Sequence, residues 1–171
     1  TKVIPDIICL GKALTGGTIS LAATVSSEKI NKKFLNKEDS YALMHGPTYM
    51  ANPLACSAAN ASLDLFENYP RLTQVKKIEN YLSKNLMNCL DYKRVTNVSV
   101  KGAVGSIQIK DLTNKEIMWF KKKFLKKGIW IRPFGNVIYT TPPFIINKKQ
   151  LELITNSMIE CLEEWSSIKR I

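Results

Sequence analysis

The hydrophobic pattern of the chain opens with two short apolar runs. Residues 6–10 (DIICL) and 21–26 (LAATVS) are almost continuously apolar, which is typical of strands that are buried on both faces of a sheet. Gly11 ends the first run, and a glycine-rich segment joins it to the second. We therefore predict two strands of an α/β fold whose sheet is covered on both sides, followed by a short helix and a surface loop over residues 28–45.

Helical periodicity begins after residue 50. Asn52 is a favoured N-cap and Pro53 suits the first helical position, so a closely packed helix of small residues is expected to run to about Glu67. Pro70 interrupts the pattern, and apolar residues then recur at helical spacing as far as Leu90. This second repeat predicts an amphipathic helix of about five turns that links two domains.

The remainder of the chain has an α+β pattern, and the change near residue 92 predicts a domain boundary between residues 1–92 and 93–171. Four apolar runs predict strands: residues 98–100, 104–109, 129–131 and 137–139. Capping boxes at residues 113–116 and 147–150 predict the starts of two helices, and Gly128 is placed to end the first of them.

The composition is that of a globular chain, with 45% hydrophobic and 23% charged residues in a total of 171. We expect no membrane partner and a cytoplasmic location, because no apolar run approaches about 18 residues and the start lacks the layout of a signal peptide. Four widely spaced cysteines are expected to be buried thiols: Cys9, Cys56, Cys89 and Cys161. His45 is the only histidine and the acidic residues do not cluster, so no metal site is assigned.

The net charge of +11 raises the question of a nucleic-acid partner. Five lysines lie between residues 121 and 127, on a segment where Ile117, Phe120 and Phe124 recur at helical spacing, so most of these lysines are expected to form a solvated helix face. No nucleic-acid-binding motif accompanies the charge, and we therefore expect no nucleic-acid partner. A basic nucleic-acid-binding module stays as an alternative, which steeply salt-dependent retention on nucleic acid would distinguish.

Candidate chemistry begins in LGKALTGG, residues 10–17, where Lys12 lies between apolar segments and glycines. An apolar setting disfavours the ammonium form, which makes the neutral amine available as a nucleophile or for imine formation. The small neighbours would let a flat cofactor approach the backbone closely. A solvated turn lysine is the alternative interpretation, because most lysines are exposed.

Two further segments offer groups for binding anions. Thr48, in HGPT (residues 45–48), has a hydroxyl close to a predicted helix start, where free N–H groups favour a phosphate. Arg132, in WIRPFG (residues 130–135), could present its guanidinium to a carboxylate, with Phe134 as an apolar wall. An ordinary proline-containing loop and a structural arginine paired with a neighbouring acid are the respective alternatives.

Three stretches taken together resemble one family: PDIICLGKALTGG, MHGPTYMANPLACSAANASL and GIWIRPFGNVIYTTPPFII. They are similar to class III aminotransferases, fold-type I enzymes that use pyridoxal 5′-phosphate (PLP), over nearly the whole chain. The lysine motif is shared by many of these enzymes, whereas HGPTYMANPLA and IRPFG narrow the resemblance to the adenosylmethionine-8-amino-7-oxononanoate aminotransferases of biotin biosynthesis. The resemblance implies that Lys12 forms a Schiff base with PLP and carries the proton while an amino group passes from S-adenosylmethionine to 8-amino-7-oxononanoate, giving 7,8-diaminononanoate.

The resemblance also implies how the cofactor and the substrate are held. Pro47 and Thr48 would contact the cofactor phosphate across the interface of a homodimer, with Gly46 beside the substrate. Arg132 would bind the carboxylate of 8-amino-7-oxononanoate, and Phe134 would line its pocket.

The resemblance places the chain in the C-terminal part of such an enzyme. Residues 1–92 would be the end of the large PLP-binding domain with a linking helix, and residues 93–171 the small α+β domain. In the family an aspartate for the pyridine nitrogen, an aromatic residue on the ring and a Gly-Ser phosphate loop precede the active lysine, whereas eleven residues precede Lys12. We therefore expect a fragment that is inactive by itself. Open alternatives are another class III ω-aminotransferase, a split or decayed gene product, and lysine as the amino donor.

Overall fold

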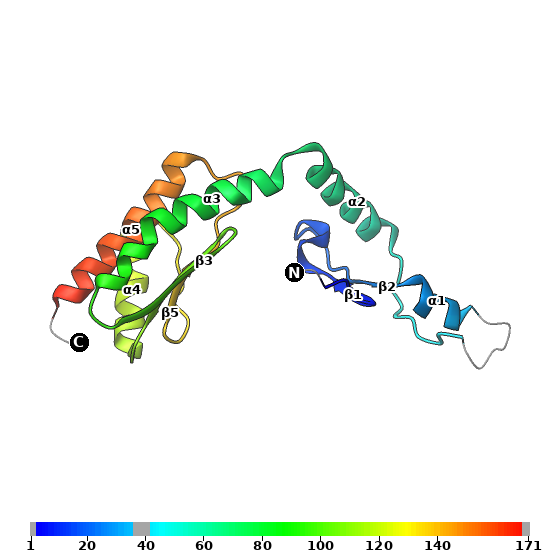
Figure 1. Ribbon diagram of the computed structural model, residues 1–171, viewed down its shortest axis with the longest axis horizontal. Coiled ribbons are helices and arrows are strands. Elements are labelled where there is room, and N and C mark those ends of the chain that lie inside the picture. The colour runs from blue at the N-terminus through cyan, green and yellow to red at the C-terminus, as the bar shows by residue number, and fades with distance from the viewer. Residues whose placement is uncertain (1–2, 36–41, 169–171) are drawn as a thin grey trace. The chain divides into compact units, whose positions relative to one another are not determined.

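The computed structural model describes residues 3–35 and 42–168. The chain divides into two compact units, of which the first ends at Pro70 and the second begins at Arg71 (Figure 1). Each unit combines helices with a sheet of its own. None of the helices in the described ranges has both the length and the apolar character that a membrane span needs.

The first unit is built around a two-stranded sheet. Its elements are β1 (Ile7–Leu10), the 3-10 helix η1 (Lys12–Thr15), β2 (Ala23–Ser26), α1 (Glu28–Phe34) and α2 (Pro53–Asn68). The strands pair in antiparallel orientation, with Ile7 opposite Ser26 and Leu10 opposite Ala23. Both predicted strands and the predicted short helix are confirmed. Part of the loop predicted up to residue 45, residues 36–41, lies outside the described residues.

Helix α2 begins where the sequence predicted it and packs on η1. The side-chain oxygen of Asn52 accepts hydrogen bonds from the N–H groups of Leu54 and Ala55 at 3.0 and 3.3 Å, which confirms the N-cap. Small buried side chains, among them Ala55, let the helix approach η1 closely. The hydroxyl of Ser62 donates to the carbonyl oxygen of Ala13 at 3.1 Å and fixes this contact.

The sheet of the first unit is open rather than covered. Every residue of β1 is exposed, and Ile7 and Ile8 retain 52% and 44% of their accessible surface. On β2, Val25 is likewise exposed. The prediction of a sheet covered on both faces is therefore wrong for the described residues, because they place too few side chains over β1 and β2.

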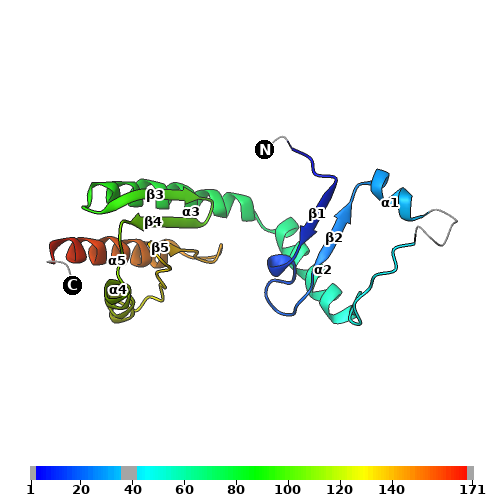
Figure 2. The ribbon, with the colours of Figure 1, turned by 90° about the horizontal axis from the view of Figure 1, so that it is seen from below.

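The second unit has a three-stranded antiparallel sheet in the order β3–β4–β5 (Figure 2). Its elements are α3 (Arg71–Leu86), the 3-10 helix η3 (Met87–Asp91), β3 (Val95–Lys101), β4 (Val104–Ile109), α4 (Asn114–Lys126), β5 (Val137–Thr140) and α5 (Lys148–Ser167). Three of the four predicted strands are confirmed by β3, β4 and β5. The capping boxes predicted at the starts of α4 and α5 are also confirmed.

The fourth predicted strand, residues 129–131, is wrong. Ile129 and Ile131 are buried and Trp130 is exposed, so the side chains alternate as in a strand. The backbone is not paired with a neighbouring strand there; instead, the N–H of Ile129 donates to the carbonyl oxygen of Phe124 and closes the end of α4. Alternation without a partner strand therefore gave a false signal.

The hydrophobic core lies in the second unit. Helix α3 packs against β3, β4 and α5, and α4 packs against α5. The fully buried side chains at these contacts include Leu82 and Leu86 on α3, Phe120 and Phe124 on α4, and Leu162 on α5. Helix α3, expected to link two domains, is thus part of the second unit. The assignment of residues 1–92 and 93–171 to two domains of the larger fold stays a prediction.

A buried carboxylate joins several of these elements. Glu116, 1% exposed, accepts hydrogen bonds from Arg94 at 2.6 Å, from the Thr113 N–H at 2.8 Å and from Trp165 Nε1 at 3.2 Å. Burial alone would raise the pKa of Glu116, but the hydrogen bonds from Arg94 and Thr113 outweigh it and hold the pKa at about 2. Glu116 is therefore ionised in the folded chain near neutral pH.

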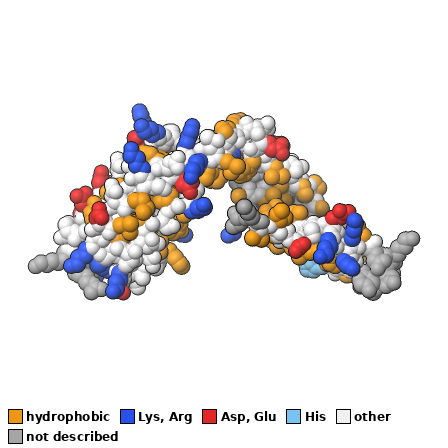
Figure 3. All heavy atoms as spheres, in the orientation of Figure 1, with side chains coloured by type: hydrophobic (Ala, Val, Ile, Leu, Met, Phe, Trp, Pro, Cys, Tyr) orange, Lys and Arg blue, Asp and Glu red, His pale blue; other side chains and the backbone are white. Residues whose placement is uncertain are grey.

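The five lysines between residues 121 and 127, in α4 and at its C-cap, do not all belong to one solvated face. Lys122 and Lys126 are exposed, as expected. Lys123 and Lys127 are partly buried and form ion pairs with Glu164 and Glu160 on α5. Figure 3 shows basic side chains distributed over the visible surface of this unit rather than gathered in one patch.

The cysteines differ in their environments. Cys89 and Cys161 are buried, and burial raises the pKa of each thiol to about 11. Cys56 is partly buried, and Cys9 is exposed on β1. The prediction of a buried thiol is wrong for Cys9, because the described residues leave β1 uncovered.

Candidate active site

Lys12 is held at a sharp turn directly after β1. It is the first residue of η1 and has a φ of 52°, in the left-handed region. The turn continues through Gly16 and Gly17, whose φ values of 61° and 82° favour glycine. Lys12 lines an open cavity of about 570 Å³ together with residues of the segment 15–22.

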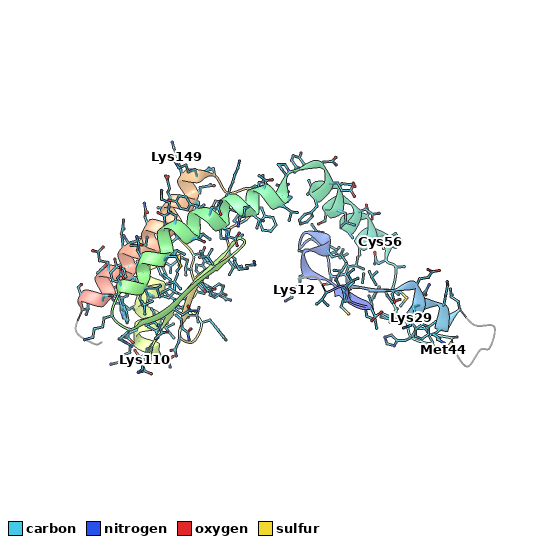
Figure 4. The ribbon with its side chains drawn as sticks, in the orientation of Figure 1. Lys12, Lys29, Met44, Cys56, Lys110 and Lys149 are labelled. Carbon is cyan, nitrogen blue, oxygen red and sulfur yellow. The ribbon has the colours of Figure 1, made fainter. Side chains whose placement is uncertain are left out.

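The ammonium of Lys12 has no hydrogen-bond or ion-pair partner among the described residues. Its side chain is exposed, so the dry setting suggested by the sequence is not supplied by the described residues. Figure 4 shows it projecting from the turn away from α2. Gly17 and Ala22 leave room beside it, and Thr18 and Ser20 add hydroxyl groups to the cavity lining. An unpaired amine beside small residues fits a flat, covalently attached cofactor.

Three hydroxyl groups hold the lysine turn in place, and sequence reasoning did not identify them. Thr15, 3% exposed, donates to the carbonyl oxygen of Ile19 at 2.5 Å. Thr18 donates to the carbonyl oxygen of Thr15 at 2.8 Å, and Ser62 reaches the turn from α2. The threonines flanking the glycine pair were the available signal, whereas Ser62 is far from Lys12 in sequence.

Pro47 and Thr48 lie in an exposed turn before α2. The carbonyl oxygen of Pro47 accepts a hydrogen bond from the Met50 N–H at 2.9 Å, and the Thr48 hydroxyl has no partner among the described residues. Gly46 is tightly approached, since a Cβ there would lie 3.3 Å from Met50 Cε. The first N–H groups of α2 are occupied by Asn52, so they are not free for a phosphate as the sequence suggested.

The HGPT turn and the lysine turn are separate within the first unit. Gly46, Pro47 and Thr48 do not belong to the lining of the Lys12 cavity. Figure 4 places Met44, close to this turn in sequence, well away from Lys12. The described residues of the first unit therefore do not bring Pro47 and Thr48 to the cavity that Lys12 lines.

Arg132 lines a cavity of about 600 Å³ in the second unit, formed by residues 128–132, the end of β5 and the start of α5. Its guanidinium is exposed and has no hydrogen-bond or ion-pair partner in the described part of the chain. A structural pairing with an acid, the alternative interpretation of Arg132, is thus not observed there. Tyr139 on β5 lines the same cavity, and sequence reasoning did not single it out.

Phe134 lies next to this cavity in sequence but does not belong to its lining. It is 80% exposed, and its backbone pairs with Val137 across a turn in which Gly135 has a φ of 52°. Within the described unit, the apolar wall beside Arg132 is instead formed by Ile131, Leu153 and other residues of the lining.

No cluster of three or more metal-ligating side chains occurs within residues 3–35 and 42–168. The described residues of the candidate site offer amine, guanidinium and hydroxyl groups, to which a cofactor would add further reactivity.

Comparison with known proteins bears on which cofactor that is. A family model described as aminotransferase class-III matches residues 1–162. The chain belongs to this family. The resemblance and the α/β fold class inferred from the sequence are thereby confirmed, and the PLP dependence of class III aminotransferases fits the exposed amine of Lys12.

Two curated relatives of this aminotransferase chain have the same name. The adenosylmethionine-8-amino-7-oxononanoate aminotransferase of Buchnera aphidicola subsp. Schizaphis graminum is 44% identical over 162 residues, covering 95% of this chain and 37% of the relative. The protein of the same name from Saccharomyces cerevisiae is 39% identical over 175 residues, covering 97% of this chain and 36% of the relative. The chain thus spans about 37% of the length of the first of these relatives.

Two solved structures of aminotransferases match the fold of this chain. The adenosylmethionine-8-amino-7-oxononanoate aminotransferase from Methanocaldococcus jannaschii matches with a TM-score of 0.83 at 33% identity, covering 94% of this chain and 39% of that one. An amine transaminase from an uncultivated Pseudomonas species, described as PLP-bound, matches with a TM-score of 0.83 at 26% identity, covering 94% of this chain and 38% of that one. The aminotransferase chain therefore has the fold of the corresponding part of these enzymes.

Proposed function

We propose that this chain supplies the active lysine and the carboxylate-binding arginine of an enzyme that converts 8-amino-7-oxononanoate to 7,8-diaminononanoate, with S-adenosylmethionine as amino donor. The observation that carries the proposal is the unpaired amine of Lys12 beside a cavity lined by small residues, in a class III aminotransferase chain. The shared name of the curated relatives supports the substrate. Because the chain spans about 37% of such a relative, the activity is proposed for these residues joined to the remaining length that the relatives have.

Lys12 acts at the reacting centre in this proposal. PLP, when bound, supplies an electron sink that lets an amino group leave one substrate and join another. Lys12 Nζ is the atom of this chain that would hold it covalently and, once released as a free amine, would take up and return the proton at the substrate carbon. Thr15, Thr18 and Ser62 position the amine by fixing the turn.

Arg132 orients the keto acid in this proposal. Its unpaired guanidinium can receive a carboxylate through two parallel hydrogen bonds, and the Tyr139 phenol can add a third. Phe134, which is 80% exposed and follows Arg132 by two residues in sequence, would line the pocket once substrate is bound.

A homodimer is part of the proposal, because Pro47 and Thr48 would hold the cofactor phosphate of the partner's site, with Gly46 beside the substrate. The segment around Pro47 and Thr48 has exposed apolar side chains that a second copy would bury, since Met44, Tyr49 and Leu54 are 90%, 80% and 74% exposed. Sedimentation of the assembled enzyme should give the mass of a dimer, and a monomer at micromolar concentration would contradict this part. The proposed location is the cytoplasm, which cell fractionation tests.

A chimera tests the proposed function. This chain replaces the matching part of the Buchnera relative, to which it is 44% identical, and formation of 7,8-diaminononanoate is measured. Lys12→Ala should abolish turnover, whereas Arg132→Ala should raise the KM for the keto acid by about tenfold or more and leave the half-reaction with S-adenosylmethionine nearly unchanged. Arg132→Lys, which keeps the charge without the planar fork, is the matched control. Its KM for the keto acid should lie between the values of the unmodified chimera and of Arg132→Ala. A folded, PLP-binding chimera without activity contradicts the proposal, as does equal loss of both half-reactions in Arg132→Ala.

A further inference from the structure

A groove between α3 and α5 in the second unit has no part in the proposed reaction. The two helices pack side by side, as Figures 1 and 2 show. The groove has a volume of about 320 Å³, at the lower end of the range of roughly 300–1,000 Å³ for small-molecule sites. It shares only Ile146 with the lining of the Arg132 cavity and includes neither Arg132 nor Tyr139.

The floor and lip of the groove are apolar. Ile78 on α3 and Leu151 on α5 form the floor and are 4% and 5% exposed. Phe144 and Ile145, in the loop before α5, form the lip and are both exposed. Apolar side chains at a lip that stays open to solvent gain free energy when an alkyl chain covers them.

Two lysines, one from each helix, also line the groove. Lys77 on α3 is exposed and has no partner among the described residues. Lys148 is the first residue of α5, where the positive end of the helix dipole adds to its charge. Its Nζ lies 3.7 Å from Glu152 Oε1 with the lysine side chain 82% exposed, which makes a weak ion pair that an anion can displace.

Neutral polar groups complete the lining. The amide oxygen of Gln74 accepts a hydrogen bond from Arg71 at 3.0 Å, which directs its NH₂ group to other acceptors. Tyr81 is half-buried in the wall; burial, followed by the charge of Glu152, raises the pKa of its phenol and keeps it a neutral donor. Glu152 also faces this region, and its negative charge offsets one of the two positive charges of Lys77 and Lys148.

We propose that this groove binds an aliphatic carboxylate of medium chain length, with the carboxylate between Lys77 and Lys148 and the alkyl chain over Ile78 and Leu151. The apolar floor favours an alkyl chain over a compact, highly charged anion such as a phosphate, because burying a polyanion on Ile78 and Leu151 would leave most of its oxygens without donors. The inference stands independently of the proposed function, since it uses neither Lys12 nor Arg132.

The test is an NMR titration of the full chain, labelled at the isoleucine δ1 methyl groups, with octanoate and with uncharged octanamide of the same length. Ile78 and Ile145 report on the groove, and Ile129 and Ile131 report on the Arg132 cavity. Octanoate should shift the groove methyls saturably, at about fivefold lower concentration than octanamide.

Variants assign the binding to the two lysines. The double variant Lys77→Gln/Lys148→Gln should weaken octanoate binding about fivefold and leave octanamide unchanged. Lys122→Gln/Lys126→Gln, at two exposed lysines of α4, is the matched charge control and should bind octanoate as the unmodified chain does. Arg132→Gln should also leave the shifts of Ile78 and Ile145 unchanged.

Four results would overturn the inference. These are equal affinity for octanoate and octanamide, undiminished octanoate binding by the Lys77→Gln/Lys148→Gln variant, shifts confined to Ile129 and Ile131, and no saturable shift at all. The third result would leave the proposed role of Arg132 intact, so failure of the groove and failure of the proposed function are distinguishable.

Discussion

Replacing Glu116 by glutamine tests the main electrostatic feature of the second unit. Glu116 is 1% exposed and accepts hydrogen bonds from Arg94, Thr113 and Trp165. Although burial opposes ionisation, the hydrogen bonds from Arg94 and Thr113 keep the pKa of Glu116 at about 2, against 4.5 for an unperturbed glutamate. This difference corresponds to about 3 kcal/mol of stability at neutral pH.

The sign of the pH dependence follows from the lowered pKa. Because the folded state binds the proton of Glu116 less readily than the unfolded state, the stabilisation is complete above pH 4.5 and is lost as the pH falls toward 2. At pH 3 the contribution is about 1.5 kcal/mol, roughly half of its value at pH 7. Glutamine cannot ionise, so Glu116→Gln removes this contribution at every pH.

The assay is urea denaturation followed by tryptophan fluorescence, which reports on the second unit because the three tryptophans, Trp119, Trp130 and Trp165, all lie there. Glu116→Gln should lower the free energy of unfolding by about 3 kcal/mol at pH 7 and by about 1.5 kcal/mol at pH 3. Glu163→Gln, at an exposed carboxylate of α5, is the control and should change little at either pH. Equal stability of Glu116→Gln and the unmodified chain at pH 7, or an equal deficit at both pH values, would refute the reasoning.

Three other predictions concern packing, thiol reactivity and substrate binding. Gly105→Ala should destabilise the second unit by about 1–3 kcal/mol in the same urea assay, since the added Cβ would lie 2.9 Å from Leu86 Cδ1; unchanged stability would mean that the leucine moves aside freely. Iodoacetamide at pH 8 should label Cys9 well before Cys161, because burial raises the pKa of the Cys161 thiol to about 11; mass spectrometry of timed samples checks the order, and comparable rates would contradict it. Tyr139→Phe in the chimera should raise the KM for the keto acid about tenfold through loss of one hydrogen bond to a carboxylate, and an unchanged KM would remove Tyr139 from the substrate site.

Local structure could be predicted where the deciding interactions lie within a few residues. The capping boxes of α4 and α5 and the N-cap of α2 are of this kind, because the side chain and the N–H group that it satisfies are three residues apart or fewer. The hydrogen-bonded ion pair between Arg94 and Glu116 could not be predicted, since the two residues are 22 positions apart in sequence. The strand predicted at residues 129–131 was wrong because alternation of apolar and polar side chains indicates burial and cannot reveal whether a partner strand is present.

The exposure of β1 has a different origin. Its apolar pattern predicts burial, yet Ile7 and Cys9 are exposed. A chain that spans about 37% of its relatives retains the pattern of a larger fold even where its own residues provide no cover. The same reasoning explains why Lys12, expected in a dry setting, is exposed.

The candidate site was predicted to different degrees. Lys12 and Arg132 could be singled out because a cation beside glycines or before a Pro-Phe-Gly turn is conspicuous in sequence. The hydroxyl group of Ser62 and the position of Tyr139 in the Arg132 cavity could not, because both depend on which elements the fold brings together.

The position at which PLP becomes attached tests the central claim most directly. The chimera is incubated with PLP, the covalent bond is trapped with borohydride, and the labelled peptide is identified by mass spectrometry. If Lys12 holds the cofactor, one label per chain is expected, on Lys12, and none after Lys12→Ala. Label distributed over surface lysines such as Lys29, with Lys12 unmodified, would contradict it.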